Sequence, residues 1–177
     1  GCAAMYRKVM LDEIGGFDED FFAYGDDAEL GLRARIAGWN CLYAPDAVVR
    51  HHRGATLGRT SSRRLELIER NRVLLAVKLF PWNLLCWNVP YYLARLAAGM
   101  WAAGRGKGEI GRFPTWRDKA RAAVAVLKGD FQALLLAPRM LRKRRDISRL
   151  RKLSPRQVRA LLLRNRIPLR SLTENVA

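Results

Sequence analysis

The amino-acid sequence predicts an α/β front region followed by an α-helical back region. Residues 1–75 alternate short apolar runs, turns and helical patterns, and their 11 basic and 11 acidic side chains cancel. Residues 104–166 hold 19 basic and 4 acidic side chains, which accounts for most of the chain's net charge of +17. Because a neutral region precedes a strongly cationic one, we predict two domains, residues 1–75 and residues 76–177.

Three short apolar runs predict strands in the front region. Residues 1–5 form the first, and we expect that strand to be buried. Residues 39–43 and 47–49 form two brief runs on either side of Pro45. This arrangement suits strands at the edge of a sheet, because proline removes a backbone donor and is confined to edges and bends.

Helical patterns predict three helices in the same region. The first covers residues 7–14 and should end at the glycine pair that follows. The second should start at Asp26 or Asp27 and end at Gly38, and the third covers residues 61–79. Three apolar side chains of the second helix should share one buried face: Leu30, Ala34 and Ala37.

Residues 79–94 contain no charged side chain and are crowded with aromatic residues. Pro90 interrupts the stretch and Arg95 ends it, so a clean transmembrane helix is not expected. Tryptophan and tyrosine favour the boundary between membrane and water, which is one interpretation. The other is a helical hairpin buried against the front region, and the sequence leaves both open.

Two helices of the back region carry start signals. Thr115 with Asp118 three residues on should cap the first, and Gly129 is expected to end it. Ser154 with Gln157 three residues on should cap the second. Since basic residues dominate here, we expect amphipathic helices whose cationic side faces an anionic membrane surface.

The sequence GFDEDFFAYGDDAELGLR at residues 16–33, followed by AGW at residues 37–39, resembles the second half of family 2 inverting glycosyltransferases, rhamnosyltransferases among them. The same order continues in Pro45, Ala47, Val49, His51, Gly54, Thr56 and the Arg70-Asn71 pair. The resemblance implies an α/β fold in which the front region is the C-terminal part of a GT-A sheet, the fold of nucleotide-diphospho-sugar transferases, followed by an α-helical extension. It also implies a missing donor-binding half, so that this chain would be inactive alone.

The resemblance assigns the role of general base to Asp27, which follows Asp26. A base that takes the proton of an attacking hydroxyl must be ionised, and a helix N-terminus favours the charged form while a neighbouring carboxylate opposes it. Asp26 stands where the family usually has Glu, and Glu29 stands where it usually has Asp. From the residues alone, Asp26 and Asp27 could instead simply cap the helix.

The resemblance also implies a divalent metal, Mn or Mg, near the nucleotide diphosphate. His51 is its candidate ligand in this chain, with the remaining ligands expected outside it. The alternative is a solvent-exposed pair of His51 and His52 in a loop. We expect substrate-binding residues at Tyr24, Trp39, Glu29 and Arg59.

Aromatic side chains in the front region have two possible roles. Tyr24 and Trp39 could stack on sugar faces or pack in the core, and both remain open. Phe17 and Phe21 are expected to pack.

The expected function is inverting transfer of a sugar from a nucleotide-sugar to a hydroxyl of a lipid-linked or cell-envelope polysaccharide acceptor. The three cysteines form no disulfide-like framework, so we expect a reducing compartment and a peripheral position on the cytosolic face of the membrane. A nucleic-acid-binding protein is the alternative that the basic charge suggests, but the neutral front region disfavours it and no nucleic acid is expected as a partner. The basic helices could also dock a partner protein.

Overall fold

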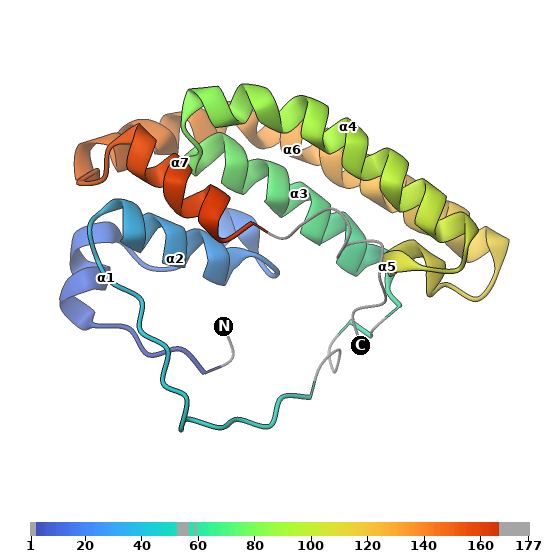
Figure 1. Cartoon of the computed structure of the whole chain (residues 1–177), viewed down its shortest axis with the longest axis horizontal. Helices are drawn as coiled ribbons and strands as arrows, with labels where there is room; N and C mark the ends of the chain where they lie inside the picture. Colours follow the sequence, from blue (N-terminus) through green and yellow to red (C-terminus); the bar gives the residue numbers. More distant parts are fainter. Residues whose placement is uncertain (1–2, 53–56, 59, 167–177) are drawn as a thin grey trace.

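The computed structural model describes residues 3–52, 57, 58 and 60–166, which form helices joined by loops. In chain order the elements are α1 (Lys8–Ile14), the short η1 (Glu19–Phe21), α2 (Asp26–Ile36), α3 (Ser62–Leu79), α4 (Trp82–Gly104), α5 (Gly108–Gly111), α6 (Trp116–Leu150) and α7 (Pro155–Arg164). The long helices α3, α4 and α6 lie alongside one another, and α1 and α2 lie beneath one end of them (Figure 1).

The predicted GT-A sheet is wrong for this chain, because none of the described residues forms a strand. Residues 39–43 and 47–49 follow an irregular course and, apart from Trp39, expose their apolar side chains, among them Leu42 at 90% and Val48 at 86%. Residues 3–5 are not a strand either, and residues 1–2 lie outside the described part. A strand needs a neighbour for its backbone N–H and C=O groups, and the described segments offer these runs none.

The predicted helices of the front region are confirmed. α1 ends at Gly15, whose φ of 82° stops the helix, and α3 starts after Ser61, whose hydroxyl accepts a hydrogen bond from the Arg64 N–H at 3.3 Å. α2 begins at Asp26 as expected. Its predicted apolar face is buried against α1, in a cluster that contains Met10, Ile14, Leu30, Ala34 and Ala37.

Both predicted start signals of the back region are also confirmed. Thr115 accepts from the Asp118 N–H at 3.1 Å, and Ser154 and Gln157 form a reciprocal capping box. The predicted end at Gly129 is wrong, because α6 continues to Leu150. Gly129 instead lets two helices meet: a Cβ built there would lie 2.4 Å from the Glu66 carbonyl oxygen of α3.

The contact between α3 and α6 is lined by small side chains of α6. Ala122, Ala125 and Ala133 flank Gly129 at spacings of three and four residues, and all are buried. The small residues on α6 let the two backbones approach closely, most of all at Gly129, while Leu65 and Leu74 of α3 pack against the alanines. The predicted division at residue 75 stays a prediction, and α3 runs across that position without a break.

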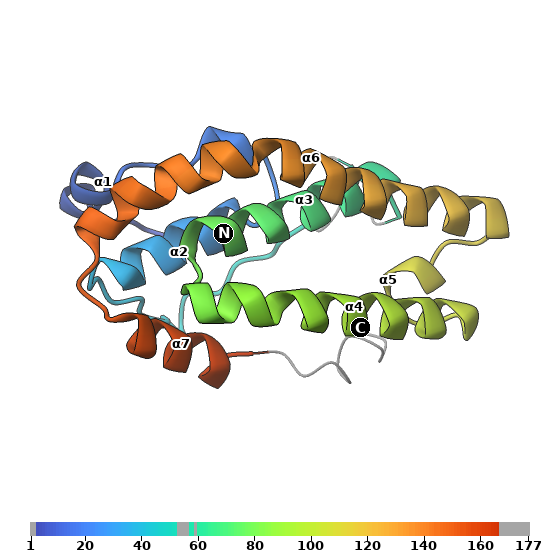
Figure 2. The ribbon, with the colours of Figure 1, turned by 90° about the horizontal axis from the view of Figure 1, so that it is seen from above.

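α4 is a single helix that continues through Pro90, so the expected interruption there did not occur. The buried-hairpin interpretation of this stretch is wrong, since Ala102 is the one residue of α4 that is buried. Within the described residues, no helix combines the length and apolar character needed to cross a membrane. Seen from above, α4 and α6 lie on either side of α3 (Figure 2).

Candidate functional site

The candidate site is built on the loop that joins α1 to α2. This loop turns sharply because Phe22, Tyr24 and Gly25 have positive φ angles of 58°, 67° and 82°. Only glycine adopts such angles without strain, so the two aromatic residues depend on contacts that hold them there. The turn delivers Asp26 and Asp27 to the first turn of α2.

Asn71 of α3 supplies those contacts. Its side chain is buried, and its Nδ2 donates to the carbonyl oxygens of Phe21 (2.7 Å), Ala23 (2.8 Å) and Tyr24 (2.6 Å). The neighbouring Arg70 donates to the Phe21 carbonyl at 3.0 Å and, through Nε, to Oδ1 of Asn71 at 2.9 Å. The Arg70-Asn71 pair therefore donates hydrogen bonds to loop carbonyl oxygens that have no partner in a helix or a strand.

The acidic side chains of this loop are paired with cations from α3 and α6. Lys78 lies 2.6 Å from Asp18, Lys143 binds both Asp18 and Asp20, and Arg139 lies 2.8 Å from Asp20. Burial raises the pKa of Asp18, but hydrogen bonds from Lys143 and Lys78 outweigh it and lower the pKa to about 2. Helix α6 thereby holds a loop that lies more than a hundred residues earlier in the chain.

Glu29 belongs to the same buried network. It is fully buried and forms ion pairs with Arg33 at 2.9 Å and Lys78 at 2.6 Å. Arg33 also donates to the carbonyls of Gly15 at 3.1 Å and Gly16 at 2.6 Å, which ties α2 to the end of α1. The structure thus places Glu29 among buried ion pairs, and Glu29 does not line the hollow described next.

A hollow of about 520 Å³ opens at the N-terminus of α2. It brings together four of the residues predicted from the sequence, namely Tyr24, Asp26, Asp27 and His51, and its lining is completed by Phe17, Gly25 and Ile68. Arg64 of α3 lies over the ring of Tyr24, 5.8 Å from its centre, and so places a cation close to the rim. Two carboxylates, an imidazole and aromatic rings therefore line the same hollow.

The two aspartates stand where a helix stabilises negative charge. Oδ1 of Asp27 accepts a hydrogen bond from the Ala28 N–H at 2.8 Å, and the positive end of the α2 dipole lies beneath both side chains. Their field reaches Tyr6, because burial and then the charges of Asp27 and Asp26 raise the pKa of its hydroxyl. Asp27 is therefore an ionised carboxylate at neutral pH, as a proton acceptor must be.

The remaining predicted residues lie elsewhere. Trp39 packs beside the α1–α2 cluster and donates from Nε1 to Glu13 at 2.9 Å, and its role in substrate binding stays a prediction. Arg59 lies outside the described residues. Phe21 is fully buried as expected, whereas Phe17 is 49% exposed, lines the hollow and forms a T-shaped ring contact with Tyr6.

Sequence reasoning noted the Arg70-Asn71 pair but did not foresee its role. A polar pair in the middle of an apolar helical face was the available signal, because a buried amide must find partners. Lys78 and Lys143 were missed altogether. Their partners lie 60 and 125 residues away in the chain, and no local pattern encodes such a pairing.

The predicted metal finds no complete set of ligands here. Among the residues that the structure describes, no group of three His, Cys, Asp or Glu side chains is placed to hold a metal ion. His51 lines the hollow with Asp26 and Asp27, but these side chains do not form a metal centre by themselves. The divalent metal stays a prediction.

The front of the chain matches a known family. The model of the family described as "Glycosyltransferase like family 2" matches residues 1–67, which contain all lining residues of the hollow except Ile68. Residues 1–67, called the family 2 segment below, are therefore similar in sequence to this glycosyltransferase family. The resemblance found in the sequence is confirmed for this family 2 segment.

Two curated relatives are similar to part of this chain. Both are named N-acetylglucosaminyl-diphospho-decaprenol L-rhamnosyltransferase and come from Mycobacterium tuberculosis, one from strain CDC 1551 / Oshkosh and one from strain ATCC 25618 / H37Rv. Each is 41% identical over 59 residues, which is 33% of this chain and 19% of the relative. The match thus spans about a fifth of the length of these relatives. No solved structure matches the chain.

Proposed function

We propose that the protein containing this chain transfers a sugar from a nucleotide-sugar donor to a hydroxyl group of a lipid-linked acceptor. The observation that carries the proposal is the hollow in which Asp27, Asp26, Tyr24 and His51 meet within the family 2 segment. The printed name of the two relatives joins a rhamnosyl group to a sugar carried on a diphospho-polyprenol, which motivates rhamnose as the donor sugar and a polyprenyl-diphosphate sugar as the acceptor.

The proposed step is a direct displacement with inversion. The acceptor oxygen forms a bond to the anomeric carbon, the bond from that carbon to the nucleoside diphosphate breaks, and the hydroxyl proton passes to a carboxylate oxygen of Asp27. A positioned base contributes about 10²–10⁴-fold to such a rate. The helix N-terminus keeps Asp27 ionised before the step and so ready to accept the proton.

Asp26 and Asp27 have different proposed roles although they are neighbours. Asp27 accepts the proton, whereas Asp26 lines the same hollow without taking up the proton. Tyr24 offers a ring face on which a sugar can stack, with the Arg64 guanidinium behind it.

The test replaces Asp27 by Asn in the full-length protein, with Asp26→Asn as the matched control. Transfer of labelled sugar and equilibrium binding of the donor are measured for both variants. We expect Asp27→Asn to lower kcat by about 10²–10⁴-fold with donor affinity nearly unchanged, and Asp26→Asn to have a clearly smaller effect. Equal loss in both variants, or full activity of Asp27→Asn, would refute the assignment of the base.

A further inference from the structure

Helix α4 exposes the side that a water-soluble helix normally hides. It has 23 residues, and its one charged residue, Arg95, turns inward to pair with Glu69 of α3 at 2.6 Å. The outward side carries Trp87 at 71% exposure and Trp101 at 56%, together with other exposed apolar residues, namely Trp82, Val89, Leu93 and Met100. In a water-soluble protein, a helix usually turns its apolar side chains inward and its charged ones outward. α4 does the reverse, because its arginine points inward and its tryptophans point outward.

Helix α6 has the same property over its first two thirds. Its side toward α3 is the seam of small residues around Gly129. The opposite side carries apolar residues at spacings of three and four, each more than 60% exposed: Val124, Leu127, Phe131, Leu134 and Leu135. At 100° per residue these positions lie roughly opposite Gly129, so they form a second apolar stripe that faces away from the core.

The two stripes are joined into one surface by two contacts between α4 and α6. The Tyr92 hydroxyl of α4 donates to Asp130 of α6, and the Arg144 guanidinium of α6 lies 4.3 Å from the ring centre of Trp82. α3 lies beneath α4 in Figure 1 and between α4 and α6 in Figure 2. We call the exposed apolar side chains of this surface the α4–α6 face, defined by Trp82, Trp87, Val89, Leu93, Met100, Trp101, Val124, Leu127, Phe131, Leu134 and Leu135.

Basic side chains surround the α4–α6 face. Arg121 is 77% exposed and Lys128 58%, while the stripe of α6 continues at its C-terminal end into exposed Arg142, Arg145 and Arg149. Of the three acidic residues of α6, only Asp146 is exposed. Arg105 lies 3.9 Å from the ring centre of Trp101 and brings a cation to the end of α4. An apolar centre with a cationic rim matches a bilayer surface of anionic headgroups over acyl chains.

We propose that the α4–α6 face binds an anionic lipid surface, with α4 and α6 lying in the plane of the interface. A second copy of this chain is a poor occupant, because residues 104–166 carry a net charge of +15 and two such surfaces repel each other. The tryptophans of α4 reach the level of the headgroups while the arginines contact phosphate.

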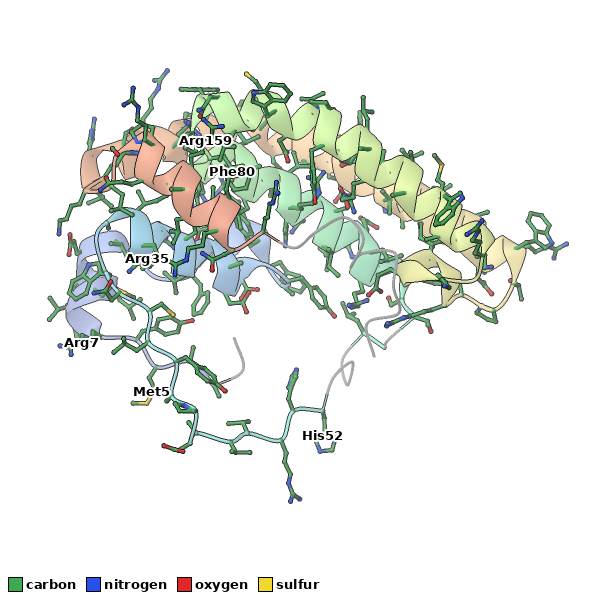
Figure 3. The ribbon with its side chains drawn as sticks, in the orientation of Figure 1. Met5, Arg7, Arg35, His52, Phe80 and Arg159 are labelled. Atoms are coloured by element: carbon green, nitrogen blue, oxygen red, sulfur yellow. The ribbon has the colours of Figure 1, made fainter. Side chains whose placement is uncertain are left out.

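The proposal is independent of the sugar-transfer chemistry. No residue of α4 or α6 lines the hollow that contains Asp27. Met5, Arg7 and His52 lie on the opposite side of the molecule from α4 (Figure 3). Lipid binding and transfer of a sugar to a soluble acceptor analogue can therefore be measured separately on the same variants.

The test is co-sedimentation of the full-length protein with vesicles of phosphatidylglycerol and phosphatidylcholine, compared with vesicles of phosphatidylcholine alone. The apolar variant replaces Trp87 and Trp101 by Ala. Its control is Leu42→Ala, since Leu42 is a large apolar residue, 90% exposed, that belongs to neither α4 nor α6. The charge variant carries Arg142→Glu, Arg145→Glu and Arg149→Glu, with Arg7→Glu as its control.

We expect the wild-type protein to bind the anionic vesicles more tightly than the neutral ones. Binding should fall about tenfold for each lost tryptophan and about fivefold for each basic residue removed, while both controls bind like wild type. Circular dichroism spectra that match wild type confirm that the variants fold. The proposal is overturned if the wild type binds no vesicles, if the apolar and charge variants bind as well as their controls, or if these substitutions abolish binding to duplex DNA or self-association instead.

Discussion

Replacing Asn71 by Asp removes the hydrogen-bond donor that fixes the acidic loop and keeps the size of the side chain. The amide of Asn71 donates to three carbonyl oxygens of the loop, those of Phe21, Ala23 and Tyr24, at 2.6–2.8 Å. A carboxylate cannot donate these bonds and would face carbonyl oxygens in a buried position. We expect the protein to lose stability and the loop to lose its turn.

The size of the expected stability loss follows from the hydrogen bonds that the substitution removes. Leaving buried carbonyls without a donor costs about 1–3 kcal/mol for each group, and the amide has two protons to supply. We therefore expect Asn71→Asp to lower the free energy of unfolding by about 3–5 kcal/mol.

The assay is urea denaturation of the full-length protein followed by circular dichroism, with Asn71→Ala as the comparison. The Ala variant removes the same donors without adding a buried charge, so its loss of stability should be smaller than that of Asp and still clear. Hydrogen exchange of the amides of residues 21–25 should accelerate in both variants. An Asp variant as stable as the wild type would show that the side chain fills space and does not hold the loop.

Two further predictions follow from the packing and the charges. Gly129→Ala places a Cβ 2.4 Å from the Glu66 carbonyl oxygen and should destabilise the protein by about 1–3 kcal/mol. The control is Gly99→Ala, whose Cβ would have no atom within 4 Å, and it should be neutral or stabilise the protein by up to about 1 kcal/mol. Thermal unfolding of both variants measures these changes. Asp18 has its pKa lowered from 3.8 to about 2, so its ion pairs contribute fully above pH 4 and are lost as the pH falls toward 2. Asp18→Asn should remove about 1–2 kcal/mol of stability at neutral pH and flatten the stability profile between pH 4 and 2, measured by urea titration at each pH; an unchanged slope would contradict the ion pairs.

Helix boundaries could be predicted from the sequence because their signals are local. Ser61, Thr115 and Ser154 cap the helices that follow them, and each cap is a bond between residues three apart in the chain. The predicted sheet was wrong because strand pairing depends on a partner segment that short apolar runs cannot specify. Gly129 was misinterpreted for a similar reason, since its role depends on α3 passing beside it.

In the candidate site, too, the sequence could predict the local features but not those that depend on distant segments. Tyr24, Asp26 and Asp27 are neighbours in sequence and stay together in the hollow, and His51 joins them. Glu29 is three residues beyond Asp26, yet the rotation of the helix turns it inward to Arg33 and Lys78. The polar partners that hold the loop could not be predicted, because they come from α3 and α6.

The central claim is that Asp27 accepts the proton of the acceptor hydroxyl. The most direct measurement is the single-turnover rate of sugar transfer by full-length Asp27→Asn protein, with donor and acceptor both saturating. We expect a rate about 10²–10⁴-fold below that of the wild type, with a normal fold and normal donor affinity. A rate equal to the wild type under these conditions would contradict the claim.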